Sequence, residues 1–198
     1  MGVEKRMADR CNTIRLYSFQ TDVVYQVLKR DGVCYSKEEY VRKKYKESAK
    51  VFINAYGWFV KEAQHIVPKP EGAEYPYWAF TDLYNVDQTG DGHVLTLDVP
   101  IGEAILFDMF DWTKIMQMHY IGENESEEAT FSEKLKNMGI NEFQIITSNF
   151  YPEQKARIQE SWKRLFGHQQ AIEAGDNSGV HSVQAGLWCI KDEWIVKE

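Results

Sequence analysis

Alternating apolar and polar residues near the start of the chain predict a strand over residues 14–20, IRLYSFQ. The period then changes to helical spacing in the segment TDVVYQVLKRDG. Thr21 is a suitable N-cap for this helix, and Gly32 can adopt the left-handed conformation that ends it. The opening therefore predicts a strand followed directly by a helix.

The same two periods predict the other elements. A long helix over roughly 37–66 begins with a capping box, Ser36 to Glu39, and ends before Pro68. Strands are predicted over 75–81, 93–99, 104–107 and 143–147, and in the closing segment HSVQAGLWCIKDEWIV. Helices are predicted from Asp108 to Gly122, from Thr130 to Gly139 and from Pro152 to Phe166, with a loop over 167–180.

Strands and helices do not alternate as regular βαβ units, which favours the α+β class with small antiparallel or mixed sheets. In one version of this fold, the strands are divided between two split sheets. We expect a tail over residues 1–13 and a single α+β domain over 14–198. Of the 198 residues, 43% are hydrophobic and 14% aromatic, which is enough for a substantial core.

Charge and cysteine content narrow the function classes. The net charge of -7 and the pI of about 5.3 make nucleic acid or an anionic membrane an unexpected partner. We find no apolar run near the ~20 residues that span a bilayer and no secretory signal. The three cysteines form no CxxC, so we expect reduced thiols in a cytoplasmic protein and no metal site.

The segment DQTGDGHVLTLD, Asp87 to Asp98, is close to the calcium-loop pattern of an EF-hand. An EF-hand loop needs helices on both sides and a bidentate Glu in its last position. Here the last position is Asp98, inside a strand pattern. We therefore interpret the segment as a turn that leads into a strand.

Acids followed by Trp stand at the predicted start of a helix, as Asp108, Asp111 and Trp112. The two acids can cap the helix and complement its dipole. They can also contact a ligand, and the sequence leaves both alternatives open.

Several segments, in this order and spacing, resemble a bacterial and phage family catalogued as domain of unknown function 3841. They are RLYSFQ, YWAF, LDVPIGEAILFDMFDW, ESWKRLF and VQAGLWCIKDEW. The resemblance extends from about Ile14 to Val196. Two polar positions of the family motif are replaced here by Phe107 and Thr113, whereas Gln184 to Trp188 preserves the last motif.

A more distant resemblance is to the ADP-ribosyltransferase superfamily, whose members bind NAD in a cleft between split sheets. By order along the chain, the resemblance implies cleft positions at Ser18 and Gln20, at Trp78 and Phe80, and at Gln184 to Gly186. The catalytic Glu of that superfamily has no counterpart at Gln184 or Gly186. Without this carboxylate the transition state loses electrostatic stabilisation. Binding of NAD without ADP-ribosyl transfer is therefore as consistent with the sequence as catalysis.

We therefore expect a cleft for NAD or another nucleotide-type molecule, with NAD cleavage or ADP-ribosyl transfer as the reaction if there is one. The alternative is a non-catalytic module that binds a protein partner or sequesters a nucleotide. The expected cofactor-binding residues are Ser18, Gln20, Trp78, Phe80, Asp108, Asp111, Trp112, Gln184 and Trp188.

Overall fold

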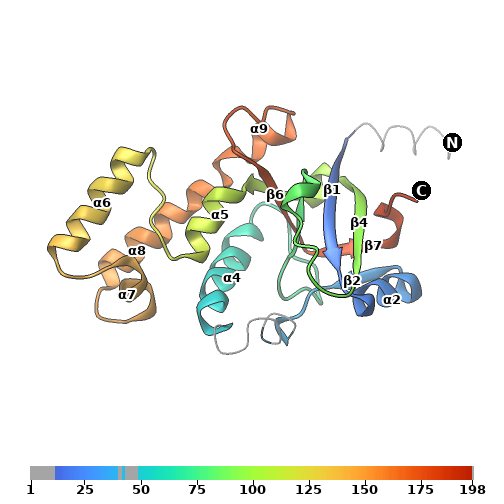
Figure 1. Ribbon diagram of the computed structural model, residues 1–198, viewed down its shortest axis with the longest axis horizontal. Coiled ribbons are helices and arrows are strands. Elements are labelled where there is room, and N and C mark those ends of the chain that lie inside the picture. The colour runs from blue at the N-terminus through green and yellow to red at the C-terminus, as the bar shows by residue number, and fades with distance from the viewer. Residues whose placement is uncertain (1–11, 40–41, 43–48, 198) are drawn as a thin grey trace.

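A computed structural model describes residues 12–39, 42 and 49–197, and over these residues the chain forms a five-stranded antiparallel sheet and a two-stranded sheet (Figure 1). The larger sheet has the order β4-β1-β3-β6-β5, and the smaller one pairs β2 with β7. The strands are β1 (Thr13–Gln20), β2 (Val33–Tyr35), β3 (Tyr77–Phe80), β4 (His93–Pro100), β5 (Ile105–Asp108), β6 (Val183–Leu187) and β7 (Cys189–Lys191). The predicted single-domain α+β class is confirmed.

The helices surround the larger sheet on both faces and extend away from it. The α-helices are α2 (Asp22–Asp31), α4 (Ala49–Ala63), α5 (Met109–Met116), α6 (Glu125–Asn137), α7 (Glu142–Thr147), α8 (Pro152–Ser161) and α9 (Gln169–Glu173). Short 3-10 helices are η2 (Leu83–Asn85), η3 (Ile101–Glu103), η4 (Trp162–His168) and η5 (Asp192–Trp194). In Figure 1, α6 and α7 lie far from the sheet, with α4 and α5 between them and the strands.

Local sequence signals account for the ends of helix α2 and for the start of helix α5. Gly32 ends α2 with φ 76° and donates its backbone N–H to the carbonyl of Leu28, as a left-handed C-cap does. Thr21 occupies the N-cap position of α2 without a side-chain capping hydrogen bond. At the start of α5, Asp108 is the predicted cap, and its carboxylate accepts from the backbone N–H of Phe110.

Side chains alternate between the two faces of a strand, so the pairing registers assign each residue of the sheet to one face. We call one side the aromatic face; α4 and α5 cover part of it, and it carries Tyr17, Trp78, Phe80, Gln184, Gly186 and Phe107. The other side, the aliphatic face, packs with α2 and carries Leu16, Ser18, Ala79, Ala185 and Leu106. The core consequently divides into an aromatic-rich and an aliphatic layer.

The larger sheet is nearly divided between β1 and β3. Strand β1 pairs with β4 along its whole length, from Thr13 to Gln20, whereas within the described residues its ladder with β3 consists of the pair Tyr17 and Phe80. The Ser18 hydroxyl donates across this junction to the backbone carbonyl of Trp78, at 2.7 Å. A side chain thus links the two parts of the sheet where backbone pairing is sparse.

Both outer strands of the sheet have part of their outer backbone paired. The backbone N–H of Val196 donates to the carbonyl of Thr96 in β4, and Ile195 forms a β-bridge with Leu97. On the opposite edge, the side chain of Gln169 accepts from the backbone N–H of Leu106 at 2.5 Å and donates to the carbonyl of Ala104 at 3.1 Å.

Several predicted elements differ from the structure. Residues 143–147, predicted as a strand, belong to helix α7, which has a capping box formed by Asn141 and Gln144. The short apolar run FQII fits either element, and the local cap decides in favour of the helix. Helix α6 begins at Glu125 with Asn124 as its cap, rather than at Thr130.

Other differences concern boundaries. Helix α5 ends at Met116 rather than at Gly122, and the positive φ of Met118, 65°, follows it. The predicted loop over 167–180 contains the end of η4 and helix α9, and the short strand β2 was not predicted. Much of the first half of the helix predicted over 37–66, and most of the tail over 1–13, lie outside the described residues.

Candidate functional site

A row of side chains crosses the aromatic face from one strand to the next. The registers pair Thr96 with Tyr17, Tyr17 with Phe80, Phe80 with Gln184, and Gln184 with Phe107. We call these five residues the cross-strand row. Phe107 is fully buried beneath α4 and α5, whereas Tyr17 and Phe80 are half-buried. The row therefore runs from the covered part of the aromatic face to its open part.

The side chain of Gln184 has an unusual position in this row. The residue is 4% exposed and lies between the rings of Phe80 and Phe107, yet its amide makes no hydrogen bond to any residue that the structure describes. Its amide atoms are not completely enclosed. Burying an amide without a partner costs free energy, so this group is well placed to receive a polar group from a ligand.

A shallow hollow of about 470 Å³ adjoins the open end of the row. It is lined by side chains from β1, α2 and β4 and by the segment after η5, including Arg15, Tyr17, Tyr25, His93, Thr96 and Val196. Arg15 forms a bidentate ion pair with Asp98, at 2.5 and 3.1 Å, and its side chain is 51% exposed. The hollow has the size of a small-molecule site and combines three aromatic rings with an accessible guanidinium.

The covered end of the aromatic face is filled by packed rings. The Trp78 indole N–H donates to the Tyr56 hydroxyl at 2.7 Å, and its ring centroid lies 4.8 Å from that of Trp112. Phe59 of α4 packs over Gly186, where an added Cβ would lie 2.9 Å from the ring atom Cζ. Gly186, one of the two positions at which the ADP-ribosyltransferase resemblance implied an acid, is therefore closed by Phe59.

The structure brings some of the predicted site residues together and separates others. Trp78, Phe80, Trp112 and Gln184 share the aromatic face. Ser18 and Gln20 lie on the aliphatic face, where the Gln20 amide donates to the Ser18 hydroxyl at 2.8 Å, so the sheet itself separates them from Gln184. Trp188 is 3% exposed and donates to the carbonyl of Val67, further along the covered end.

Asp108 and Asp111 lie at the start of α5, beside the beginning of β6. Asp108 is 4% exposed, and one carboxylate oxygen accepts from the backbone N–H and the ring Nδ1 of His181, at 3.0 and 2.8 Å. Burial alone would raise the pKa of Asp108, but hydrogen bonds from the backbone N–H groups of His181 and Phe110 hold it below its usual range. Burial raises the pKa of Asp111, opposed by Lys114 at 3.6 Å and reinforced by Asp108.

His181 is a site residue that the sequence did not indicate. It precedes β6 and reaches Asp108 across 73 residues of sequence, because β5 and β6 pair with Asp108 opposite Val183. The imidazole is 74% exposed and lies 4.9 Å from the ring of Phe110, centroid to centroid. No local motif links the two positions, so the contact becomes evident only from the strand register.

The segment Asp87 to Asp98 follows η2, and from His93 onward it belongs to β4, so the loop leads into a strand rather than into a helix. The Asp87 carboxylate accepts from the backbone N–H and the hydroxyl of Thr89, and Asp98 forms an exposed ion pair with Arg15 on the neighbouring strand β1. Gly90 has φ 111°, in the region that glycine favours. The interpretation as a turn leading into a strand agrees with this geometry.

Comparisons with known proteins complete the description of the site. The model of a family described as Domain of unknown function (DUF3841) matches residues 15–196. No curated protein and no solved structure matches the chain. Among the helices of the described residues, none combines the length and the apolar character needed to cross a membrane.

Proposed function

The chain belongs to the DUF3841 family, whose description assigns no activity, and we propose that it binds a nucleotide-type small molecule, with NAD as the first candidate, along the cross-strand row. The observation that carries the proposal is the Gln184 amide, which lies between two rings and makes no hydrogen bond within the described part of the chain. An amide offers both a donor and an acceptor, as recognition of a carboxamide, base edge or ribose requires.

In this proposal the ligand extends from the hollow toward Gln184. A base or nicotinamide ring stacks on Phe80 or Tyr17; by alanine substitution such stacking contributes about 1–3 kcal/mol per base. The Gln184 amide binds a polar edge of the ring or its ribose. Arg15, already oriented by Asp98, lies at the rim of the hollow, where its guanidinium can contact phosphate oxygens.

The same geometry favours binding over ADP-ribosyl transfer. The nearly divided sheet supports the distant resemblance to ADP-ribosyltransferases, whose NAD cleft lies between split sheets. However, Gln184 supplies no charge for an oxocarbenium-like transition state, and Phe59 occupies the space above Gly186. We therefore propose nucleotide binding in a protein of bacterial or phage origin, without the carboxylate that this superfamily places on the late strand.

The test is the melting temperature Tm with and without millimolar NAD, AMP or nicotinamide. A ligand at 100 times its Kd stabilises the fold by about 2.7 kcal/mol, which for a chain of this size raises the Tm by roughly 5–10 °C. Gln184→Met keeps the length of the side chain and removes the amide, so we expect the fold to remain and the shift to disappear. Gln64→Met, at an exposed position after α4, is the matched control and should keep the shift.

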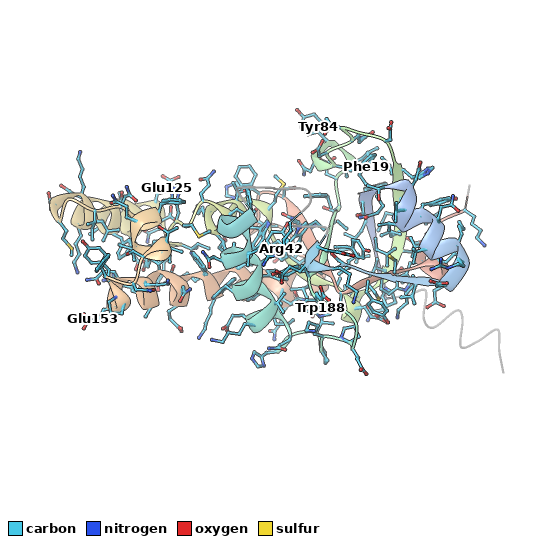
Figure 2. The ribbon with its side chains drawn as sticks, turned by 90° about the horizontal axis from the view of Figure 1, so that it is seen from below. Phe19, Arg42, Tyr84, Glu125, Glu153 and Trp188 are labelled. Carbon is cyan, nitrogen blue, oxygen red and sulfur yellow. The ribbon has the colours of Figure 1, made fainter. Side chains whose placement is uncertain are left out.

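A second candidate function is protein binding, and it has its own observation. Leu83, Tyr84 and Phe110 are 44, 92 and 51% exposed, and Figure 2 shows Tyr84 projecting at the margin of the molecule. If none of the three ligands changes the Tm, nucleotide binding along the row is wrong, and these exposed side chains become the surface to test with protein partners.

A further inference from the structure

Three segments that are far apart in the sequence meet around Ser182. The side-chain amide of Asn85 donates to the Ser182 hydroxyl at 2.7 Å, and the backbone N–H of Met109 donates to the Ser182 carbonyl at 2.8 Å. The ring of Phe110 lies 4.9 Å from that of His181, centroid to centroid. Helix η2, the start of α5 and the loop before β6 therefore form one continuous surface.

This surface presents three exposed apolar side chains, Leu83, Tyr84 and Phe110, which we call the anchor surface. The backbone beneath both rings is held in place. The Asp82 carboxylate accepts from the backbone N–H of Tyr84 at 2.8 Å, and the Asp108 carboxylate accepts from that of Phe110 at 3.0 Å. Exposed aromatic side chains on a fixed backbone are the usual anchors of a protein interface, because little conformational entropy is lost when they are covered.

The charge around the anchor surface is negative. The three segments that form it contain aspartates but no lysine or arginine: residues 81–92, 105–113 and 174–183. Asp82 and Asp87 are exposed on either side of Tyr84 in the sequence. The first cation of α5, Lys114, lies 3.6 Å from the Asp111 carboxylate. A partner that carries positive charge is therefore complementary to this surface.

The exposed rings favour the same kind of partner. The face of an aromatic ring attracts a guanidinium or ammonium group. Asp82 and Asp87 lie within three residues of Tyr84, a span of at most about 11 Å, so a cation packed on this ring also lies in the field of their carboxylates. The same field repels nucleic acid and anionic membranes, which leaves a basic protein segment as the complementary partner.

We propose that the anchor surface binds a protein segment in which arginine or lysine stands beside an aliphatic or aromatic residue. The cation packs on the ring of Tyr84 and is attracted by Asp82 and Asp87, while the apolar side chain contacts Leu83 and Phe110. This inference names the chemistry of the partner for the second candidate function and rests on that function. It is independent of nucleotide binding along the cross-strand row.

The experiment selects random peptides displayed on phage against the whole chain and measures the Kd of the enriched peptides by fluorescence anisotropy. We expect enrichment of peptides with arginine or lysine next to an apolar residue. Tyr84→Ser should weaken their binding by about 30-fold, as loss of an interface hot spot does. Phe150→Ser removes a similarly exposed ring between α7 and α8, so this matched control should bind as the unaltered chain does.

A second pair of variants tests the contribution of charge. Asp82→Asn keeps an oxygen that can cap η2 and removes the charge, so it should weaken peptide binding by about two- to fivefold at low salt. This loss should disappear at high salt, where exposed charges are screened. Glu153→Gln is the control, because Glu153 is exposed at the start of α8 and lies far from Tyr84 in Figure 2. It should leave the Kd unchanged.

The possible failures are distinguishable. Absence of enriched peptides, or peptides that bind Tyr84→Ser as tightly as the unaltered chain, would refute both this inference and protein binding at the anchor surface. Peptides that depend on Tyr84 but lack arginine and lysine would overturn the inference and leave protein binding intact. Self-association of the unaltered chain in sedimentation, lost in Tyr84→Ser, would assign the surface to a second copy and overturn the inference as well.

Discussion

Replacing Gly186 with alanine tests the packing that closes the covered end of the aromatic face. An added Cβ would lie 2.9 and 3.2 Å from Cζ and Cε1 of Phe59 and 3.5 Å from Cβ of Pro76. The ring cannot move freely, because Phe59 is fully buried and its centroid lies 5.1 Å from Trp78, 5.6 Å from Phe107 and 5.3 Å from Trp112. An alanine methyl group at this position would therefore overpack the core.

Overpacking of this kind typically costs about 1–3 kcal/mol. For a chain of this size each kcal/mol lowers the Tm by roughly 2–4 °C, so we expect Gly186→Ala to lower the Tm by about 2–12 °C. Gly57 provides a matched control on helix α4, since an added Cβ there meets no atom within 4 Å. Gly57→Ala should raise the stability by about 0.5–1 kcal/mol through helix propensity.

A double-mutant cycle identifies Phe59 as the cause. Phe59→Leu alone should destabilise the fold by leaving a cavity, but the smaller leucine side chain leaves room for a methyl group on Gly186. The double variant should be more stable than the sum of the single changes predicts, with a coupling of about 0.5–3 kcal/mol. The reasoning is refuted if Gly186→Ala melts at the temperature of the unaltered chain, or if the two changes are additive in thermal or urea unfolding.

Three further predictions concern titration, capping and thiol chemistry. Burial raises the pKa of Asp111 above its unfolded value of about 3.9, so the ionised carboxylate opposes folding at neutral pH. Asp111→Asn should therefore raise the Tm at pH 7, and this gain should shrink as the pH falls through the folded pKa toward 4. An equal gain at pH 7 and at pH 4 in calorimetry would contradict this. Asn141→Ala should cost about 0.5–2 kcal/mol in urea unfolding, because it removes the capping box of α7, whereas no loss would argue against a helix there. Burial raises the pKa of Cys189 to about 11, so a thiol reagent at pH 8 should leave Cys189 unmodified in the folded chain and modify it in urea, as mapped by mass spectrometry.

The sequence predicted best those elements whose signals are local. Alternation over IRLYSFQ gave β1, helical spacing and Gly32 gave α2 with its left-handed end, and Asp108 was recognised as a cap. These signals act within a few residues, so one sequence contains them. The wrong strand over 143–147 also has a local explanation, since the Asn141 and Gln144 pair that caps α7 was not recognised as a capping box.

The candidate site was predictable only in part, because its geometry depends on strand order and register. The order of motifs placed Ser18 and Gln184 in one cleft, but the alternation of side chains places them on opposite faces of the sheet. Nothing near His181 in the sequence indicates Asp108, because that contact depends on the pairing of β5 with β6. Long-range pairing of this kind cannot be deduced from residue types alone.

The paired backbone at the outer strands has a consequence for self-association. Unpaired strand edges allow a second chain to extend a sheet, which is a common route to aggregation. Here residues 195 and 196 occupy the outer side of the central part of β4, and the Gln169 amide satisfies the backbone N–H of Leu106 and the carbonyl of Ala104 at β5. A glutamine side chain cannot propagate a ladder as a strand would. It therefore blocks β-sheet extension at β5 while leaving no buried backbone group unsatisfied at those two positions.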